Sequence, residues 1–140
     1  MLATWDVAAT KRLDWRACEC ANCRNFEEVA EKHLPTQLLA LLNEFEVEPA
    51  NATYMTLTNS NEDDGSARYE GHYAVLGTLS EARSDVLHKD DGCRIWIDRD
   101  PWTGGAHTYP GGYRNPHLAA PAFFLNFSVT LPWLLAEEPN

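Results

Sequence analysis

The segment Ala122-Phe-Phe-Leu-Asn-Phe-Ser-Val-Thr130 decides the fold class of this chain. Its apolar residues Phe123, Leu125, Phe127 and Val129 recur at every second position and alternate with Phe124, Asn126, Ser128 and Thr130. This period of two is typical of a half-buried β-strand with one apolar face. Because such a strand must pair with others, the rest of the sequence has to supply partner strands.

Three further segments favour β-structure. They are Tyr54–Thr58, Tyr69–Thr78 and Cys93–Asp98. The dipeptide Asp64-Gly65 predicts a hairpin turn between the first two. We expect the second strand to be bent or bulged at Gly71 or Gly77. Residues 1–17 have room for one short additional strand.

The pattern of the residues before these strands is helical. Apolar residues from Phe26 to Leu34 recur every three to four positions and predict a helix, for which Asn25 is a suitable N-cap. Pro35 interrupts this helix, and the leucine-rich Pro35–Phe45 predicts a second one. The sequence therefore predicts an α+β fold, in which an antiparallel sheet of about four to five strands carries a short N-terminal helical pair on one side. We expect residues 1–140 to form a single domain.

The charge of the chain limits its partners. It has 21 acidic and 11 basic residues, a net charge of −10. Nucleic acids and anionic membrane surfaces repel such a chain, so we expect neither as a partner and favour a basic protein. No secretory signal and no apolar stretch of about 20 residues is present, so we expect a cytoplasmic protein.

Three of the four cysteines lie in the segment Cys18-Glu-Cys20-Ala-Asn-Cys23. Two thiolates at Cys-x-x-Cys spacing can bind one tetrahedral zinc ion, and a third thiolate can join them. Cys93 is the natural fourth ligand, which gives a predicted zinc site of Cys18, Cys20, Cys23 and Cys93. The alternative fourth ligands are His33, His72, His88, His107 and His117.

Other interpretations of the cysteines stay open. One of them is an iron–sulfur cluster, although the cysteine spacings match neither common ferredoxin pattern. The thiols could instead pack as small apolar side chains in a reducing compartment. Cys23, expected directly before a helix, could also be a reactive thiolate, although no parallel βαβ pattern surrounds Cys20-Ala-Asn-Cys23.

The cysteines belong to a wider pattern. It comprises Cys18-x-Cys20-x-x-Cys23-x-Asn25-Phe26, Pro35 and the leucine-rich helix, Tyr69-Glu-Gly-His-Tyr73, and Leu131-Pro-Trp133. This pattern resembles a family of small uncharacterised bacterial proteins that also occur in phage and mobile-element contexts. The resemblance covers Trp15–Thr78 and the C-terminal strand. It implies no activity and identifies no ligand set.

No other segment carries a strong chemical motif. Asn59–Gly65 superficially resembles a calcium loop, but it places Gly71 where a ligating glutamate is required. The aromatic and glycine-rich stretch Trp102–His117 could line a binding surface. No hydrolase motif is present. The first hypothesis is therefore a non-catalytic acidic interaction module with a structural zinc site. The alternatives are a zinc- or thiol-dependent enzyme and a purely structural domain with buried cysteines.

Overall fold

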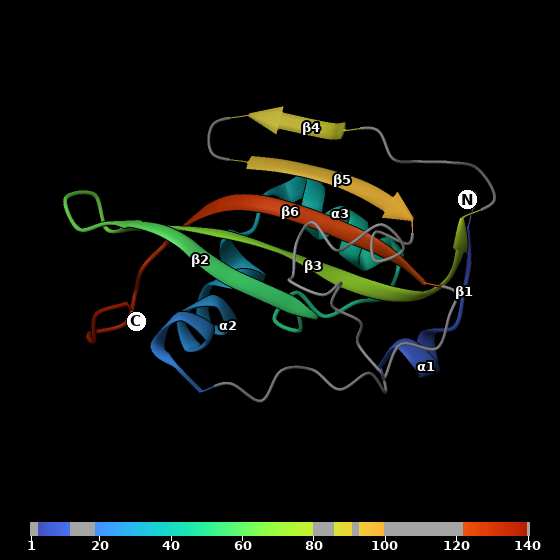
Figure 1. Cartoon of the computed structure of the whole chain (residues 1–140), viewed down its shortest axis with the longest axis horizontal. Coiled ribbons are helices and arrows are strands. Elements are labelled where there is room, and N and C mark those ends of the chain that lie inside the picture. Colours follow the sequence, from blue (N-terminus) through green and yellow to red (C-terminus); the bar gives the residue numbers. More distant parts are fainter. Residues whose placement is uncertain (1–2, 12–18, 80–85, 91–92, 100–121, 140) are drawn as a thin grey trace, which may run out of the picture.

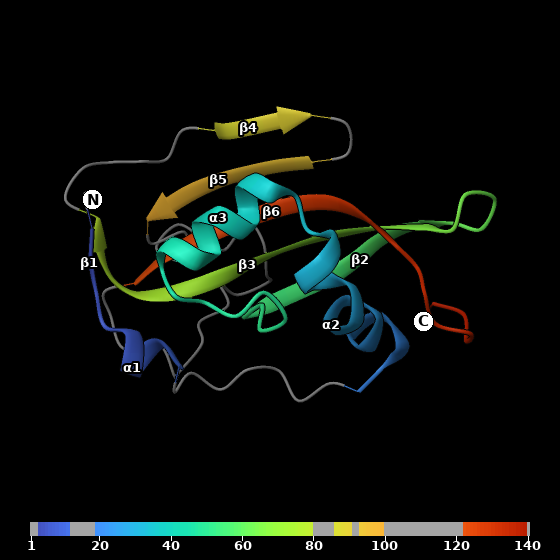
Figure 2. The ribbon, with the colours of Figure 1, turned by 180° about the vertical axis from the view of Figure 1, so that it is seen from behind.

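A computed structural model of the chain describes residues 3–11, 19–79, 86–90, 93–99 and 122–139. Its elements are β1 (Ala3–Trp5), α1 (Val7–Lys11), α2 (Ala21–His33), α3 (Thr36–Glu44), β2 (Tyr54–Asn61), β3 (Ser66–Leu79), β4 (Val86–Asp90), β5 (Cys93–Arg99) and β6 (Ala122–Pro132). The predicted α+β fold is confirmed. The described strands form one antiparallel sheet, and α2 and α3 lie on one of its faces (Figures 1 and 2). None of the described helices is long and apolar enough to span a membrane.

The long strands β3 and β6 form the centre of the sheet. They pair from Ser66↔Pro132 to Leu76↔Ala122 without a register shift. On the other side of β3, its first part pairs with β2 and its last residues pair with β1. Beyond β6 follow β5 and then β4. The sequence did not predict β4, because a five-residue segment with two apolar residues carries no clear period.

Of the bend or bulge expected in β3 at Gly71 or Gly77, no bulge is present, because neither glycine lies at a register shift. The one register shift between β2 and β3 lies in β2, between Leu57 and Asn59. A Cβ atom on Gly71 would collide with the carbonyl oxygen of Tyr54, and one on Gly77 would collide with that of Thr4. The glycines therefore allow β2 and β1 to approach β3 closely. The predicted turn at Asp64-Gly65 is confirmed, with Gly65 at φ 67°.

The core lies between the sheet and the two helices. The alternating residues of β6 predicted to be apolar and inward-facing are all at most 1% exposed. Phe26 of α2 packs on them, with its ring centroid 5.8 Å from that of Phe127 and 5.3 Å from that of Tyr69. Leu38 and Leu42 of α3 are fully buried. The apolar face expected for the first helix is therefore confirmed, whereas Leu39 and Leu41 of α3 are only partly buried.

The predicted start of the first helix is wrong. α2 begins at Ala21, and Cys20 rather than Asn25 occupies the N-cap position. Asn25 lies inside the helix and is fully buried. Its side chain does not cap the helix but bonds to the segment that follows β6, at Pro132 and Leu134.

A candidate binding groove beside the C-terminal segment

Asn25 connects α2 to the segment that follows β6. Its Nδ2 atom donates to the carbonyl oxygen of Pro132 (3.0 Å) and to the hydroxyl of Tyr69 (3.1 Å). Its Oδ1 atom accepts a hydrogen bond from the backbone N–H of Leu134 (2.8 Å). Tyr69 in turn donates to the carbonyl oxygen of Asn22 (2.9 Å). A buried amide with three hydrogen bonds fixes the path of the chain after β6.

Contacts of Trp133 and Arg24 also hold the C-terminal segment in place. The backbone N–H of Trp133 donates to the carbonyl oxygen of Gly65 (2.8 Å), in the turn between β2 and β3. The indole N–H of Trp133 donates to the carbonyl oxygen of Glu137 (2.8 Å). Arg24 of α2 forms an ion pair with the Glu137 carboxylate and donates from Nε to the carbonyl oxygen of Glu19. The C-terminal segment is thus tied to both the hairpin and the helix.

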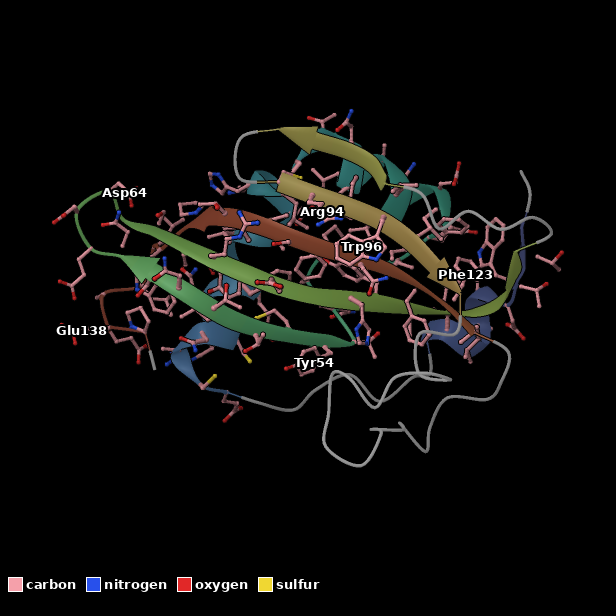
Figure 3. The ribbon with its side chains drawn as sticks, turned by 45° about the horizontal axis from the view of Figure 1, so that its top comes forward. Tyr54, Asp64, Arg94, Trp96, Phe123 and Glu138 are labelled. Carbon is pink, nitrogen blue, oxygen red and sulfur yellow. The ribbon has the colours of Figure 1, made fainter. Side chains whose placement is uncertain are left out.

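A groove of about 270 Å³ lies between this segment and the β2–β3 turn. We call it the C-terminal groove. One wall is formed by residues of the turn region between Ser60 and Ser66, and the other by Trp133 and residues 135–139. Figure 3 shows Asp64 at the tip of the hairpin and Glu138 on the C-terminal segment, at the same end of the molecule. Trp133 and Leu135 give the lining an apolar part.

Within the part of the chain that the structure describes, the charged residues that line the C-terminal groove are all acidic. They are Glu62, Glu137 and Glu138. The hydrogen bond from Arg24 lowers the pKa of the Glu137 carboxyl below its ordinary value, so this group is ionised at neutral pH. Asp63 and Asp64 are exposed on the neighbouring turn. The groove therefore combines an apolar surface with a concentration of negative charge, which suits a cationic side chain.

Comparison of the chain with known protein families, with curated proteins and with solved structures finds no match. The resemblance to a family of small bacterial proteins stays a prediction. The N-terminal and C-terminal parts of the sequence pattern that carries this resemblance are nevertheless in contact, because Asn25 bonds to Pro132 and Leu134. Two sequence features named above lie in this part of the molecule, namely the pattern of Asn25-Phe26 with Leu131-Pro-Trp133 and the polar turn Asn59–Gly65.

The described cysteines occupy different environments. Cys20 is half-buried at the N-cap of α2, Cys23 is 5% exposed within the helix, and Cys93 is 5% exposed on β5. Cys23 and Cys93 belong to the hydrophobic core. Cys18 lies outside the described residues. Within the described ranges, no three His, Cys, Asp or Glu side chains are grouped so that they could hold a metal ion. The zinc site of Cys18, Cys20, Cys23 and Cys93 stays a prediction.

The helix start also changes the interpretation of Cys23. The sequence placed Cys23 just before a helix, where a thiolate would be stabilised. In the structure that position belongs to Cys20, and Cys23 lies in the first turn with its side chain in the core. Asn25 does not act as the N-cap, because its side chain bonds to Pro132 and Leu134 instead.

The described histidines considered as ligands lie on different elements, His33 on α2, His72 on β3 and His88 on β4, where its Cα pairs with that of Ile95. His33 is exposed at the end of α2, whereas His72 on β3 is 7% exposed. Burial lowers the pKa of His72 to about 4, so it is neutral at pH 7. Its ring lies near Tyr54 (5.8 Å between centroids) and Phe124 (5.1 Å). His107, His117 and the whole stretch Trp102–His117 lie outside the described residues.

Proposed function

We propose that this protein is a non-catalytic, acidic interaction domain that binds a basic segment of a partner protein in the C-terminal groove. The observation that carries the proposal is the lining of that groove, where the described residues include three carboxylates and apolar side chains but no lysine or arginine. The net charge of −10 supports the same class of partner, because it attracts basic proteins over longer distances.

The chemistry of the groove favours lysine or arginine as the bound residue. The aliphatic part of such a side chain can lie on Trp133 and Leu135, while its charged end reaches Glu62, Glu137 or Glu138. Each exposed ion pair contributes little by itself, and salt weakens it. Specific binding therefore depends on the wall being held in place by Asn25, Trp133 and Arg24.

A synthetic peptide tests this proposal directly. The probe is a short peptide with two arginines and two lysines, and its control carries citrulline and acetyl-lysine instead. Binding is followed by the chemical shifts of backbone amides in 15N-labelled protein at low and at physiological salt. We expect saturable shifts at residues 60–66 and 133–139 with the basic peptide only, which weaken as salt is added.

Charge-matched variants locate the binding site. Glu62→Gln and Glu138→Gln are each expected to weaken binding by about two- to fivefold. Glu44→Gln removes one charge from the exposed end of α3 and should leave the affinity unchanged. If Glu44→Gln weakens binding as much as Glu138→Gln, only net charge matters and the groove has no special role.

We further propose that the cysteine cluster binds a structural zinc ion, which supports the N-terminus of α2. The support for this is the Cys-x-Cys-x-x-Cys spacing of Cys18, Cys20 and Cys23. Elemental analysis and native mass spectrometry of protein purified without a metal-affinity step provide the test. About one zinc ion per chain, lost in Cys20→Ser, would support the site. Loss of zinc in Cys93→Val as well would include Cys93 among the ligands. A metal-free protein would leave the cysteines as packing residues.

A further inference from the structure

The C-terminal groove has carboxylates on both of its walls. Glu62 belongs to the hairpin wall, and Glu137 and Glu138 belong to the C-terminal wall. Trp133 and Leu135 supply apolar surface in the same groove. Figure 3 shows Glu138 on the C-terminal segment, at the end of the molecule where the β2–β3 hairpin also lies. The groove therefore carries negative charge on two separate segments of the chain, together with apolar surface.

Two hydrogen-bond donors of the lining are already used within the protein. The hydroxyl of Ser66 donates its hydrogen to the Asp64 carboxylate (2.6 Å), so its oxygen can only accept a hydrogen bond from a ligand. The indole N–H of Trp133 donates to the carbonyl oxygen of Glu137 (2.8 Å). The carboxylates of the two walls are acceptors as well. An ammonium group complements these side chains, because it has three N–H donors and no acceptor.

The size of the groove limits the ligands that it can hold. Its volume is about 270 Å³, slightly less than that of pockets for drug-sized molecules, which is about 300–1,000 Å³. A lysine side chain of a partner brings one ammonium group into this space, although both walls carry carboxylates. A free aliphatic diamine brings an ammonium group at each end, and its hydrocarbon chain can lie on Trp133 and Leu135 as a lysine stem would.

We propose that the C-terminal groove binds a small aliphatic diamine, with one ammonium group at each wall. This rests on the proposed function, because it concerns the same groove and the same preference for cations. One ammonium group pairs with Glu62 and the other with Glu138. Arg24 already pairs with Glu137, which leaves Glu138 as the main carboxylate of the C-terminal wall. A free diamine and a basic segment of a partner protein would therefore compete for the groove.

A matched series of small molecules tests this proposal. The probes are diaminobutane, with an ammonium group at each end, aminobutane, with one, and uncharged butanediol, each added to 15N-labelled protein at the same ionic strength. We expect saturable shifts at residues 60–66 and 133–139, an affinity for diaminobutane about three- to tenfold above that for aminobutane, and no binding of butanediol. The two equivalent ends of diaminobutane raise its affinity about twofold without a second ion pair, so a ratio no larger than this overturns the proposal.

Two charge-matched variants test the contact with the hairpin wall. In Glu62→Gln the advantage of diaminobutane over aminobutane should fall to about twofold, because only one wall keeps its carboxylates. Glu44→Gln removes one charge from the exposed end of α3, outside the groove, and should leave this ratio unchanged. Both side chains are exposed, so both variants should fold. Equal ratios in the two variants would overturn the proposal, because Glu62 would then have no special role.

The basic peptide described above separates a failure of this proposal from a failure of the proposed function. If the peptide binds in the groove but diaminobutane has no advantage over aminobutane, the diamine proposal is wrong and the proposed function stands. If diaminobutane binds as expected but the peptide does not, the diamine proposal stands and a basic protein is not the partner. If neither probe shifts the groove residues, both proposals are wrong.

Discussion

Replacing Asn25 by alanine is expected to destabilise the protein more than any other exchange of a polar side chain on α2. The variant removes three hydrogen bonds from a residue that is fully buried. Each bond contributes about 0.5–1.5 kcal/mol net, so their sum is about 3 kcal/mol. Tyr69 keeps its bond to Asn22, which limits the number of groups left without a partner.

Urea unfolding followed by circular dichroism measures this loss. For a domain of this size, about 3 kcal/mol corresponds to a fall in melting temperature of about 10 °C. Amide exchange gives a local readout, because the Leu134 N–H should lose its protection in Asn25→Ala. The matched control is Asn43→Ala on α3, where the side chain is exposed and the expected change is within about 0.5 kcal/mol. A destabilisation of Asn25→Ala no larger than that of Asn43→Ala would refute the assigned role of Asn25.

Two further predictions concern the sheet. Burial lowers the pKa of His72 from 6.5 to about 4, so the unfolded chain binds a proton more readily than the folded one. Neutral His72 contributes fully to stability above pH 6.5, and this contribution, up to about 3 kcal/mol, is lost as the pH falls towards 4. The urea midpoint of His72→Phe should therefore fall less than that of the wild-type protein between pH 7 and about pH 4.5. An equal fall in the two proteins would contradict this prediction. Gly71→Ala should cost about 3 kcal/mol in urea unfolding, because its Cβ would collide with the backbone of Tyr54. Gly65→Ala has free space around its Cβ and should cost only about 1 kcal/mol for its positive φ; equal costs would show that β2 can move away from β3.

The parts of the fold that were predicted correctly are those in which one face of an element is buried. In β6 the alternating apolar residues form the face that contacts the helices, although Phe124 and Ser128 on the opposite face are buried as well. The same holds for Cys93, Ile95 and Ile97 of β5, which are all buried. In these segments the local period of apolar residues indicates which face is buried, and this period is visible in the sequence without knowledge of the neighbouring elements.

The start of α2 could not be read in this way. Asparagine before a helical pattern is typical of an N-cap, and the residue type does not distinguish that role from a buried position within the helix. What decides the role of Asn25 is its contact with Pro132 and Leu134, more than 100 residues later in the chain. No local pattern encodes such a contact. β4 was missed for a related reason, since its position depends on pairing with β5 and not on its own sequence.

The contacts of Asn25 link the fold to the proposed binding site. The C-terminal wall of the groove begins where Asn25 holds Pro132 and Leu134, and it continues to Glu137, which Arg24 holds from the preceding position of the same helix. Adjacent residues of α2 therefore position both ends of the wall. Arg24 also lowers the affinity expected for a cationic partner, because it neutralises one of the three carboxylates that line the groove. The ion pair with Arg24 thus positions Glu137 but also neutralises its charge, so Glu62 and Glu138 are the carboxylates available to a cationic partner.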